Sequence, residues 1–421
     1  MLDLAIIADD ITGAADTGVQ FLPVFAPVYL LDHRSLSLEG LKPPPRALSV
    51  FTNSRGLSPA EAGRVVLETG RAVRARGPQR AYKKIDSALR GHIGAELEAV
   101  MEALDLPFSF IAPAFPAQGR STVGGVHRIH GVPVAESEMG RDPVCPVTES
   151  SLPERIRSQA RFGVGHVDRA TVEDGVEAIA ACVERLRAAG VRHITFDADR
   201  PLHLERIAEL ALSRYPEGLL CGSAGLAQGL VRRLPPRAVD ADPQEGRRGR
   251  RTGGFLFVCG SASRTLRAQT AVLAEQSGVA VETLTPAALL GEAGDEAASA
   301  QLSRAVDALS QGDLLVRVSP SAGGPPVADP QRLVSRLADF AAALMKHAPT
   351  AGLFLSGGDT AVAVLDRLQV RAVRLEKELA SGLVGGVLAG GPWSGGAVVT
   401  KAGSFGGPET LLDLYRIWRP R

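Results

Sequence analysis

Three short segments rich in glycine and serine follow apolar strand-like runs in the last third of the chain. They are Cys259–Ser263, Ser356–Thr360 and Lys401–Gly407. Each precedes a helical pattern, so we expect each turn to leave backbone N–H groups unpaired at a helix N-terminus, with the positive end of the helix dipole behind them. Such groups bind phosphate. One turn of this kind is only a connection, but three of them predict a nucleotide site.

A pair of carboxylates, Asp9-Asp10, follows the first predicted strand, residues 4–8. In open α/β sheets, ligands bind at the carboxyl ends of the strands. Neighbouring side chains of a strand point to opposite faces, so we expect one aspartate to face a ligand and the other to cap the following helix. The alternative is that both are only turn and cap residues.

Charged and polar side chains also close two further predicted strands, residues 47–52 and 81–85. They are Arg55, Lys83, Lys84, Asp86, Ser87 and Arg90. Charges at the end of a buried strand need partners. A small polyhydroxylated anion would supply them, with Arg or Lys binding its carboxylate and Asp its hydroxyls. The alternative is an internal ion network of Asp9, Asp10 and Lys84 without a ligand.

A long segment rich in proline and glycine, residues 113–150, follows the predicted strand 109–112 and adds Gln118 and Arg120. Loops of this length inside a domain are usually functional or disordered. His127 and His130 have no third ligand at a suitable spacing, so we expect packing or solvated roles for them and no metal site.

The elements that must position these residues alternate regularly. Strands are predicted at 4–8, 28–31, 47–52, 81–85, 109–112, 193–197 and 218–221, and helices at 12–21, 59–76, 93–104, 172–189 and 203–214. After residues 235–253, which carry no apolar periodicity and are predicted to be a linker, the same rhythm resumes. The glycine-rich stretch 381–396 is predicted to be flexible. The pattern predicts an α/β fold of two Rossmann-like domains, 1–234 and 254–421, each a mostly parallel sheet flanked by helices.

The composition excludes several classes of protein. The 47 basic and 46 acidic residues of the 421 nearly cancel, so nothing indicates nucleic acid or a membrane as partner. The four cysteines form no C-x-x-C pair and the N-terminus lacks the pattern of a signal peptide, so we expect a cytoplasmic protein. A homodimer is the ordinary expectation. There is neither a Walker A sequence nor a G-x-G-x-x-G fingerprint, which argues against P-loop enzymes and NAD-linked dehydrogenases.

Five separated motifs, in the same order, resemble the four-carbon acid sugar kinase family, which includes D-threonate, erythronate and 3-oxo-tetronate kinases. They are Asp9–Ala14, Lys84–Gly91, Pro116–Arg120, Ser356–Thr360 and Lys401–Gly406. The resemblance covers nearly the whole chain. It implies an N-terminal acid-sugar domain and a C-terminal ATP domain facing each other across a cleft.

The resemblance also assigns roles. It implies sugar-acid binding by Asp9, Asp10, Arg55, Lys83, Lys84, Asp86, Ser87, Arg90, Gln118 and Arg120. It implies ATP binding by Ser261, Gly357, Gly358, Asp359, Thr360, Gly403, Ser404, Phe405 and Gly406. The hypothesis is ATP- and Mg²⁺-dependent phosphorylation of the 4-hydroxyl of a four-carbon sugar acid, threonate first, with Asp10, Asp86 or Asp359 as the general base. The alternatives are an NAD(P)-linked oxidoreductase of small hydroxy acids and a non-catalytic sensor of sugar acid and nucleotide.

Overall fold

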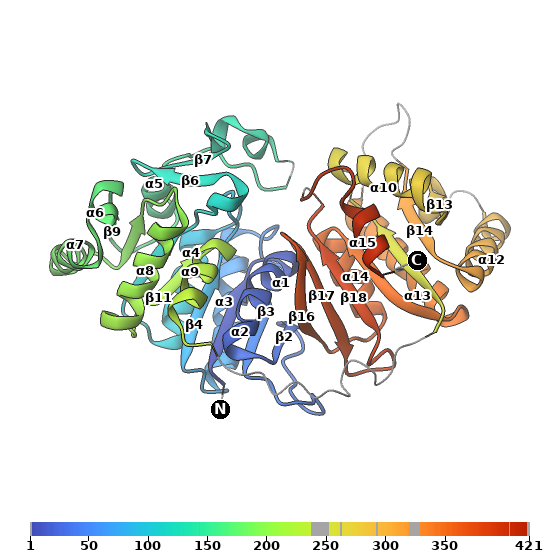
Figure 1. Cartoon of the computed structure of the whole chain (residues 1–421), viewed down its shortest axis with the longest axis horizontal. Coiled ribbons are helices and arrows are strands. Elements are labelled where there is room, and N and C mark those ends of the chain that lie inside the picture. Colours follow the sequence, from blue (N-terminus) through green and yellow to red (C-terminus); the bar gives the residue numbers. More distant parts are fainter. Residues whose placement is uncertain are drawn as a thin grey trace. The chain divides into compact units, whose positions relative to one another are not determined.

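The computed structural model describes residues 2–142, 144–236, 252–261, 263–291, 294–319, 329–403 and 405–418. The chain separates into two compact units (Figure 1), one formed by residues 1–38 with 42–239 and the other by 39–41 with 240–421. Most of the predicted linker 235–253 lies outside the described residues, so its character stays a prediction.

The first unit is built on a parallel sheet, blue to green in Figure 1. In the order of the sheet, its strands are β2 (Val28–Asp32), β3 (Ala47–Phe51), β1 (Leu4–Ala8), β4 (Arg80–Lys84), β11 (Leu219–Gly222), β5 (Ser109–Ala112), β10 (His193–Phe196) and β9 (Val164–Val167). The register pairs Ala8 with Phe51 on one side and with Lys84 on the other. The segments that follow β1, β3 and β4 therefore begin side by side at one edge of the sheet.

Helices accompany this sheet because its strands are apolar on both faces, as buried parallel strands are. They are α1 (Ile11–Gln20), α2 (Leu22–Phe25), α3 (Pro59–Arg74), α4 (Ile93–Leu104), α5 (Leu152–Arg157), α6 (Arg169–Asp174), α7 (Val176–Ala188), α8 (Pro201–Arg214) and α9 (Ala224–Arg233). The prediction of one helix over 172–189 is wrong. Gly175 has φ +105°, a left-handed conformation that separates α6 from α7.

The long segment after β5 has more regular structure than its sequence indicates. It contains the antiparallel strands β6 (Arg120–Val123), β7 (Val126–Ile129) and β8 (Val132–Pro133). The turn between β6 and β7 is held by the buried Asp197, whose carboxylate accepts hydrogen bonds of 2.7 Å from Gly124 N and 2.9 Å from Gly125 N. Strands this short show no apolar periodicity, which is why the sequence did not predict them.

The second unit has a mixed sheet. In order, its strands are β13 (Ala280–Leu284), β14 (Leu314–Val318), β12 (Gly254–Cys259), β15 (Thr350–Ser356), β18 (Ala397–Lys401), β17 (Leu383–Ala389) and β16 (Ala372–Ala380). Neighbours from β13 to β18 pair in parallel, whereas β18–β17 and β17–β16 are antiparallel. The prediction of a flexible segment over 381–396 is wrong for β17. A Cβ on Gly386 would lie 2.5 Å from Arg374 O, so glycine there permits a close approach of two strands.

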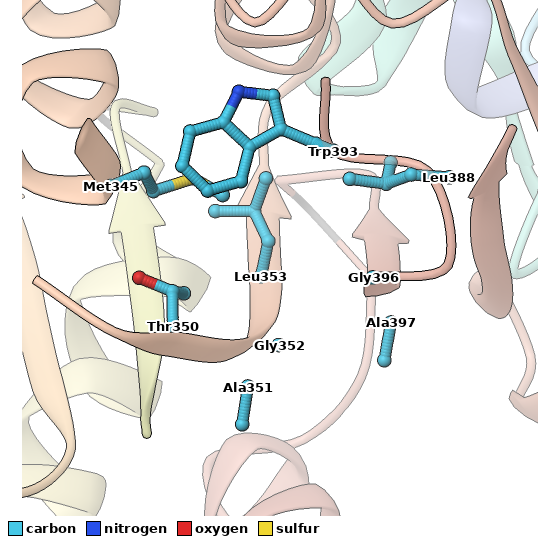
Figure 2. A pocket seen from close by; sticks show the side chains of 9 residues that line it. All are labelled: Met345, Thr350, Ala351, Gly352, Leu353, Leu388, Trp393, Gly396 and Ala397. Atoms are coloured by element: carbon cyan, nitrogen blue, oxygen red, sulfur yellow. The ribbon is translucent and has the colours of Figure 1, made fainter. Parts of the chain in front are cut away.

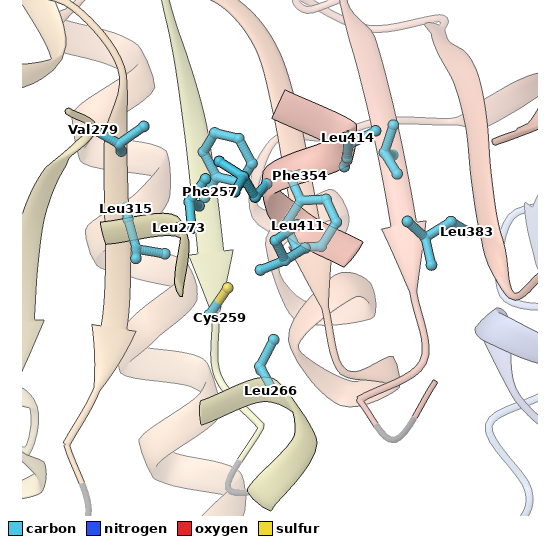
Figure 3. Close-up of a cluster of buried hydrophobic side chains, with 12 residues drawn as sticks. Phe257, Cys259, Leu266, Leu273, Val279, Leu315, Phe354, Leu383, Leu411 and Leu414 are labelled. Carbon is cyan, nitrogen blue, oxygen red and sulfur yellow. The ribbon is translucent and has the colours of Figure 1, made fainter. Parts of the chain in front are cut away.

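The helices of the second unit are α10 (Arg264–Ser277), α11 (Pro286–Leu290), α12 (Asp295–Gln311), α13 (Pro330–His347), α14 (Gly358–Arg367) and α15 (Thr410–Trp418). Figure 3 shows a core cluster in which Leu266 and Leu273 of α10 and Leu411 and Leu414 of α15 pack on the strands. This burial fixes the start of both helices above the sheet. The predicted α/β class, with mostly parallel sheets, is confirmed. Within the described ranges, no helix is long and apolar enough to cross a membrane.

Candidate functional site

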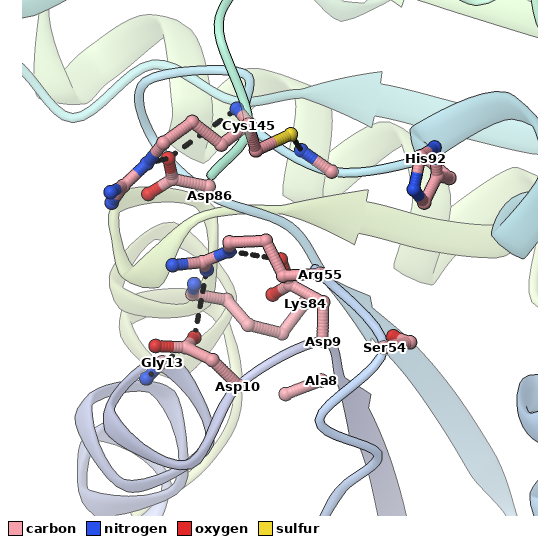
Figure 4. A network of polar contacts seen from close by, with 12 residues as sticks. Ala8, Asp9, Asp10, Gly13, Ser54, Arg55, Lys84, Asp86, His92 and Cys145 are labelled. Atoms are coloured by element: carbon pink, nitrogen blue, oxygen red, sulfur yellow. Dashed lines mark hydrogen bonds and ion pairs between the residues drawn. The ribbon is translucent and has the colours of Figure 1, made fainter. Parts of the chain in front are cut away.

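Arg55 joins the two N-terminal carboxylates at the carboxyl edge of the first unit's sheet (Figure 4). Its Nε lies 2.8 Å from Asp9 Oδ2 and its Nη2 lies 2.9 Å from Asp10 Oδ1. Burial alone would raise the pKa of Asp10, but the charges of Arg55 and Lys84 outweigh it and hold that pKa below its usual value. Asp10 is therefore a carboxylate, fixed by a cation on one side.

The two aspartates play different parts. Asp10 caps α1, since its Oδ1 accepts a hydrogen bond of 3.1 Å from Gly13 N and its Oδ2 one of 2.5 Å from Thr12 Oγ1. Asp9 is 2% exposed, and its Oδ1 has no hydrogen-bond partner among the described residues. A buried carboxylate oxygen without a partner is costly, which points to a donor that a ligand would bring.

Lys84 is the second cation of this cluster. A Cβ on Gly13 would lie 2.5 Å from both Lys84 Nζ and Asp10 Oδ1, so glycine leaves room for these two groups in their present positions at the start of α1. Lys84 is 4% exposed, and within the described part of the chain its ammonium makes neither a hydrogen bond nor an ion pair. Figure 4 shows it running beside Arg55 toward Asp10. A buried ammonium in this state needs an anionic or polar ligand.

Asp86 and Arg90 form the third part of the cluster. Arg90 Nε lies 2.6 Å from Asp86 Oδ2, and Arg90 Nη1 lies 3.1 Å from Asp142 Oδ2. Burial would raise the pKa of Asp86, but Arg90, Arg55 and Lys84 together hold it far below its usual range. Asp142 in turn accepts hydrogen bonds from the backbone N–H groups of Val144 and Cys145. These contacts fix Arg90 in the loop after β4.

Lys83 does not present its side chain to this cluster, and Ser87 is held there through its backbone carbonyl. Lys83 Nζ lies 2.6 Å from Glu96 Oε2 in the interior, on the other face of β4 from Lys84. The carbonyl of Ser87 accepts a hydrogen bond of 2.8 Å from His127 Nε2, and Thr122 Oγ1 lies 2.9 Å from His127 Nδ1. Burial lowers the pKa of His127 to about 4, so its ring is neutral at pH 7. His127 is thus a packing residue that ties β7 to the loop after β4.

Gln118 and Arg120 lie at the base of the β6–β7 hairpin. Arg120 Nη1 donates a hydrogen bond of 2.9 Å to the carbonyl of Gln118. Burial lowers the pKa of Arg120, while the nearby charge of Asp86 acts in the opposite direction. Arg120 therefore lies within electrostatic reach of the loop after β4. Across the described residues, no group of three or more His, Cys, Asp or Glu side chains is arranged to hold a metal ion.

The three glycine-rich turns of the second unit meet at the carboxyl ends of β12, β15 and β18. Ser263 Oγ donates a hydrogen bond of 2.7 Å to Gly403 O, which joins the first turn to the third. A Cβ on Gly403 would lie 2.5 Å from Ser261 Oγ, and one on Gly260 would lie 2.3 Å from Thr360 Oγ1. The turns approach so closely that only residues without a side chain fit at these two positions.

The start of α14 offers free backbone donors beside these contacts. Its first intrahelical bond joins Ala361 N to Gly357 O over 2.9 Å, so the N–H groups of Gly358, Asp359 and Thr360 precede the ladder. Gly357 has φ +102° and turns the chain from β15 into the helix. Asp359 is exposed in this first turn, whereas Thr360 is buried. The geometry is that of an anion-binding helix N-terminus.

Lys401 lies under the third turn. It is 0% exposed, and its Nζ donates hydrogen bonds of 2.8 Å to Ala402 O and 3.4 Å to Gly403 O. Burial lowers the pKa of this lysine to about 8, partly opposed by Cys259. Because the C=O and N–H of a peptide point in opposite directions, an ammonium that binds Ala402 O directs Gly403 N–H away from itself. Lys401 therefore orients the turn.

The remaining residues of the third turn have structural contacts. A Cβ on Gly382 would lie 2.6 Å from the Phe405 ring, so this ring packs over the loop between β16 and β17. Gly406 has φ +83°, which a residue with a side chain rarely adopts. Gln269 Nε2 donates to the carbonyls of Phe405 (3.0 Å) and Gly407 (2.9 Å) and so ties the turn to α10. Ser404 lies outside the described residues.

A small apolar pocket lies at the opposite, amino-terminal ends of the second unit's strands (Figure 2). Met345, Thr350, Leu388, Trp393 and Ala397 are among the residues that line it. Trp393 is half-buried there, away from the carboxyl ends where the glycine-rich turns meet. The pocket has no charged lining residue, so nothing in it suits a phosphate or a sugar acid.

Comparisons with known proteins agree with this division into two sites. Residues 4–230 match the model of a sugar-binding N-terminal domain, and residues 256–411 match that of a nucleotide-binding C-terminal domain. The chain is 32% identical to the D-threonate kinase of Bordetella bronchiseptica, over 99% of this chain and 98% of the relative. It is 29% identical to the D-erythronate kinase of Heliobacterium modesticaldum, over 97% and 95%. A solved structure from Salmonella typhimurium LT2 has a TM-score of 0.80 at 24% identity over 100% of both chains, which shows the fold alone.

Proposed function

We infer the function from one premise: the chain belongs to the four-carbon acid sugar kinase family. We propose that it transfers the γ-phosphoryl group of ATP to the 4-hydroxyl of a four-carbon sugar acid. D-threonate is the first candidate, since it is the substrate named for a relative 32% identical over nearly the whole chain. D-erythronate and 3-oxo-tetronate, named for other relatives, are the alternatives.

The buried ammonium of Lys84 is the observation that supports binding of a sugar acid by the first unit. Lys84 is a buried ammonium without a partner among the described residues, and it lies between Arg55 and the start of α1. The carboxylate of a sugar acid would neutralise it, while the free Oδ1 of Asp9 would accept a hydrogen bond from a hydroxyl. The alternative is an internal network, since the charge of Lys84 also acts on Asp10 and Asp86; titration of the protein with a sugar acid would distinguish the two.

The second unit would bind ATP at its three converging turns. The fit rests on the close approach at Gly403 and Gly260, which removes side chains from the path of a phosphate, and on the N–H groups at the start of α14. Mg²⁺, when bound, would bridge phosphate oxygens and neutralise their charge. Asp359 and Thr360 have side-chain oxygens in the first turn of α14, beside the N–H groups proposed for the phosphates. We therefore propose that these two residues hold the ion.

The general base has three candidates, Asp10, Asp86 and Asp359. Neighbouring cations hold the pKa values of Asp10 and Asp86 below the usual range, which makes both carboxylates weak proton acceptors near neutral pH. Phosphoryl transfer asks the protein mainly for positioning and charge neutralisation. We therefore propose that Asp10 and Asp86 orient Arg55 and Arg90 toward the substrate. Asp359, exposed at the start of α14, stays a candidate for base or metal ligand.

A coupled assay of ADP release over a panel of acids tests the function. The panel is D-threonate, D-erythronate, their L-forms and a 3-oxo-tetronate, each with Mg²⁺-ATP. We expect saturable turnover with one four-carbon acid, phosphate on its 4-oxygen by ³¹P NMR, and little ADP release without acid. Binding of acid and nucleotide without turnover would favour a sensor. Oxidation of NAD(P)H by a keto acid would favour the oxidoreductase. Either result would overturn the kinase.

A further inference from the structure

Glu96 of α4 contacts two segments of the first unit, and each of them leads into the charge cluster of Arg55 and Lys84. It is 1% exposed. Its Oε2 lies 2.6 Å from Lys83 Nζ, and its Oε1 accepts a hydrogen bond of 2.7 Å from Ser54 Oγ. One buried carboxylate therefore holds both the end of β4 and the loop that follows β3.

The two residues that Glu96 holds directly precede the two cations of the candidate site. Ser54 is followed by Arg55, and Lys83 is followed by Lys84. Two hydrogen bonds to backbone carbonyls strengthen these links: Ser54 N donates to Asp9 O over 3.1 Å, and the side-chain Nζ of Lys83 donates to Lys84 O over 3.1 Å. A shift of Glu96 would therefore move the backbone from which both cations project.

Close polar contacts of the Ser54 hydroxyl reach the strand that carries the aspartates. Thr52 Oγ1 lies 2.8 Å from Ser54 Oγ and 2.9 Å from Ala8 O, the last residue of β1. Glu96, Ser54 and Thr52 thus connect α4 with the ends of β3 and β1, and Lys83 adds the end of β4. These are the strand ends whose following residues form the charge cluster.

A contribution to stability alone does not account for this arrangement. Removing two charges from water is expensive, and apolar residues of similar size often replace a buried ion pair without loss of stability. Lys83 projects from the face of β4 opposite to Lys84, and its closest partner is Glu96, while the charge of Asp9 also acts on its ammonium. What the pair does supply is a fixed position of the end of β4 relative to α4.

We propose that Glu96 is a positioning residue for sugar-acid binding, acting through Ser54 on Arg55 and through Lys83 on Lys84. This inference rests on the proposed function, since it assigns the acid's carboxylate to those two cations. It predicts that weakening the network raises the KM for the acid, with the KM for ATP unchanged, because the turns of the second unit have no part in it.

The first test is Ser54→Ala, which leaves the Lys83–Glu96 pair intact and removes the hydroxyl that links Glu96 to the segment of Arg55 and to Thr52. We expect the KM for D-threonate to rise about tenfold, as for a lost hydrogen bond to a charged group. The matched control is Ser49→Ala. Ser49 is another fully buried serine, on β3, and its Oγ donates over 2.7 Å to Ala14 O, outside the network. The control should lower the melting temperature by a similar amount without changing the KM.

The second test is the double variant Lys83→Met/Glu96→Gln, which removes both buried charges at nearly constant volume. We expect it to stay folded, because it leaves no charge buried without a partner. Its KM for D-threonate should nevertheless rise, which a purely structural role would not produce.

The results separate this inference from the function on which it rests. If the wild type phosphorylates no four-carbon acid, the proposed function fails. If the wild type is active and both Ser54→Ala and the double variant keep a KM within about twofold, the positioning role alone is overturned. An equal rise in Ser49→Ala would also overturn it.

Discussion

Arg55 contacts two carboxylates at once, which no lysine can do with the same geometry. Its Nε and Nη2 lie 2.8 Å and 2.9 Å from Asp9 and Asp10. In Arg55→Lys a single ammonium would replace the planar fork, and one of these contacts would be lost. We expect the KM for the sugar acid to rise roughly 10- to 100-fold, corresponding to about 1.5–3 kcal/mol for a charged hydrogen bond. Initial rates over a range of acid concentrations measure it.

The control for this substitution is Arg64→Lys on the outer face of α3. Arg64 pairs with Glu68 where both side chains are about two-thirds exposed (63% and 60%), so the exchange should leave KM and stability unchanged. An Arg55→Lys enzyme with the KM of the control would remove Arg55 from the proposed site.

Lys401 gives the second prediction at the scale of a residue. An ordinary lysine stays charged to about pH 10, but burial lowers the pKa of Lys401 to about 8. Its positive charge, present below pH 8, is lost as the pH rises through that value. If the charge helps the third turn to hold phosphate, the KM for ATP should rise between pH 7 and pH 9.

The variant Lys401→Met identifies the titrating group. It lacks the charge at every pH, so its KM for ATP should be high and flat over the same range. A wild-type KM for ATP that does not change between pH 7 and pH 9 would contradict a phosphate role for this lysine. The KM for the sugar acid serves as an internal control, because Lys401 belongs to the second unit.

At the scale of an element, the first turn of α1 sets the space available to a ligand. A methyl group at Gly13 would lie 2.5 Å from Asp10 Oδ1 and from Lys84 Nζ, so Gly13→Ala must displace both side-chain ends. Alanine is otherwise the better helix former, by about 0.5–1 kcal/mol. We expect Gly13→Ala to lower kcat/KM for the sugar acid at least tenfold while the free energy of unfolding changes little, as measured by kinetics and urea titration.

Gly63→Ala in α3 is the matched control. The nearest atom to a Cβ there is Ala95 O at 3.9 Å, an ordinary contact. This variant should gain up to about 1 kcal/mol of stability and keep its activity. If Gly13→Ala behaves in the same way, the space beside Lys84 has no part in binding.

The elements that the sequence predicted well are those with long apolar runs. Strands such as β1, and helices such as α4 over Ile93–Leu104, follow the predicted ranges, because their burial patterns are continuous or periodic. The strand β17 was missed because glycines at 385 and 386 imitate a loop, although Gly386 there lets two strands approach.

The candidate site could be predicted only in part. Strand-end positions identified Arg55 and Lys84, because the carboxyl ends of parallel strands meet at one edge. Glu96 was missed, since in the sequence it is one acidic residue of an amphipathic helix and nothing local indicates that it is buried. The same spacing suggested Lys83 as a ligand, whereas its side chain lies with Glu96. Which face of a strand end points to a ligand depends on the neighbouring helix, and no local pattern contains that information.

At the scale of the whole molecule, each proposed ligand belongs to one compact unit. The charge cluster around Lys84 lies in the first unit, and the glycine-rich turns around Gly403 lie in the second. This arrangement predicts that substitutions in the two units act independently. Gly13→Ala should change the KM for the sugar acid and Lys401→Met the KM for ATP.

The double variant Gly13→Ala/Lys401→Met tests that independence when it is compared with the two single variants and the wild type. Since the two positions share no partner within either unit, the free-energy changes derived from the two KM values should add within about 0.5 kcal/mol. A rise in the KM for ATP caused by Gly13→Ala alone, comparable to its effect on the acid, would show that the two ligands are not divided between the units. Additivity with separate effects on the two substrates would support a phosphotransferase in which one unit holds the acceptor and the other the donor.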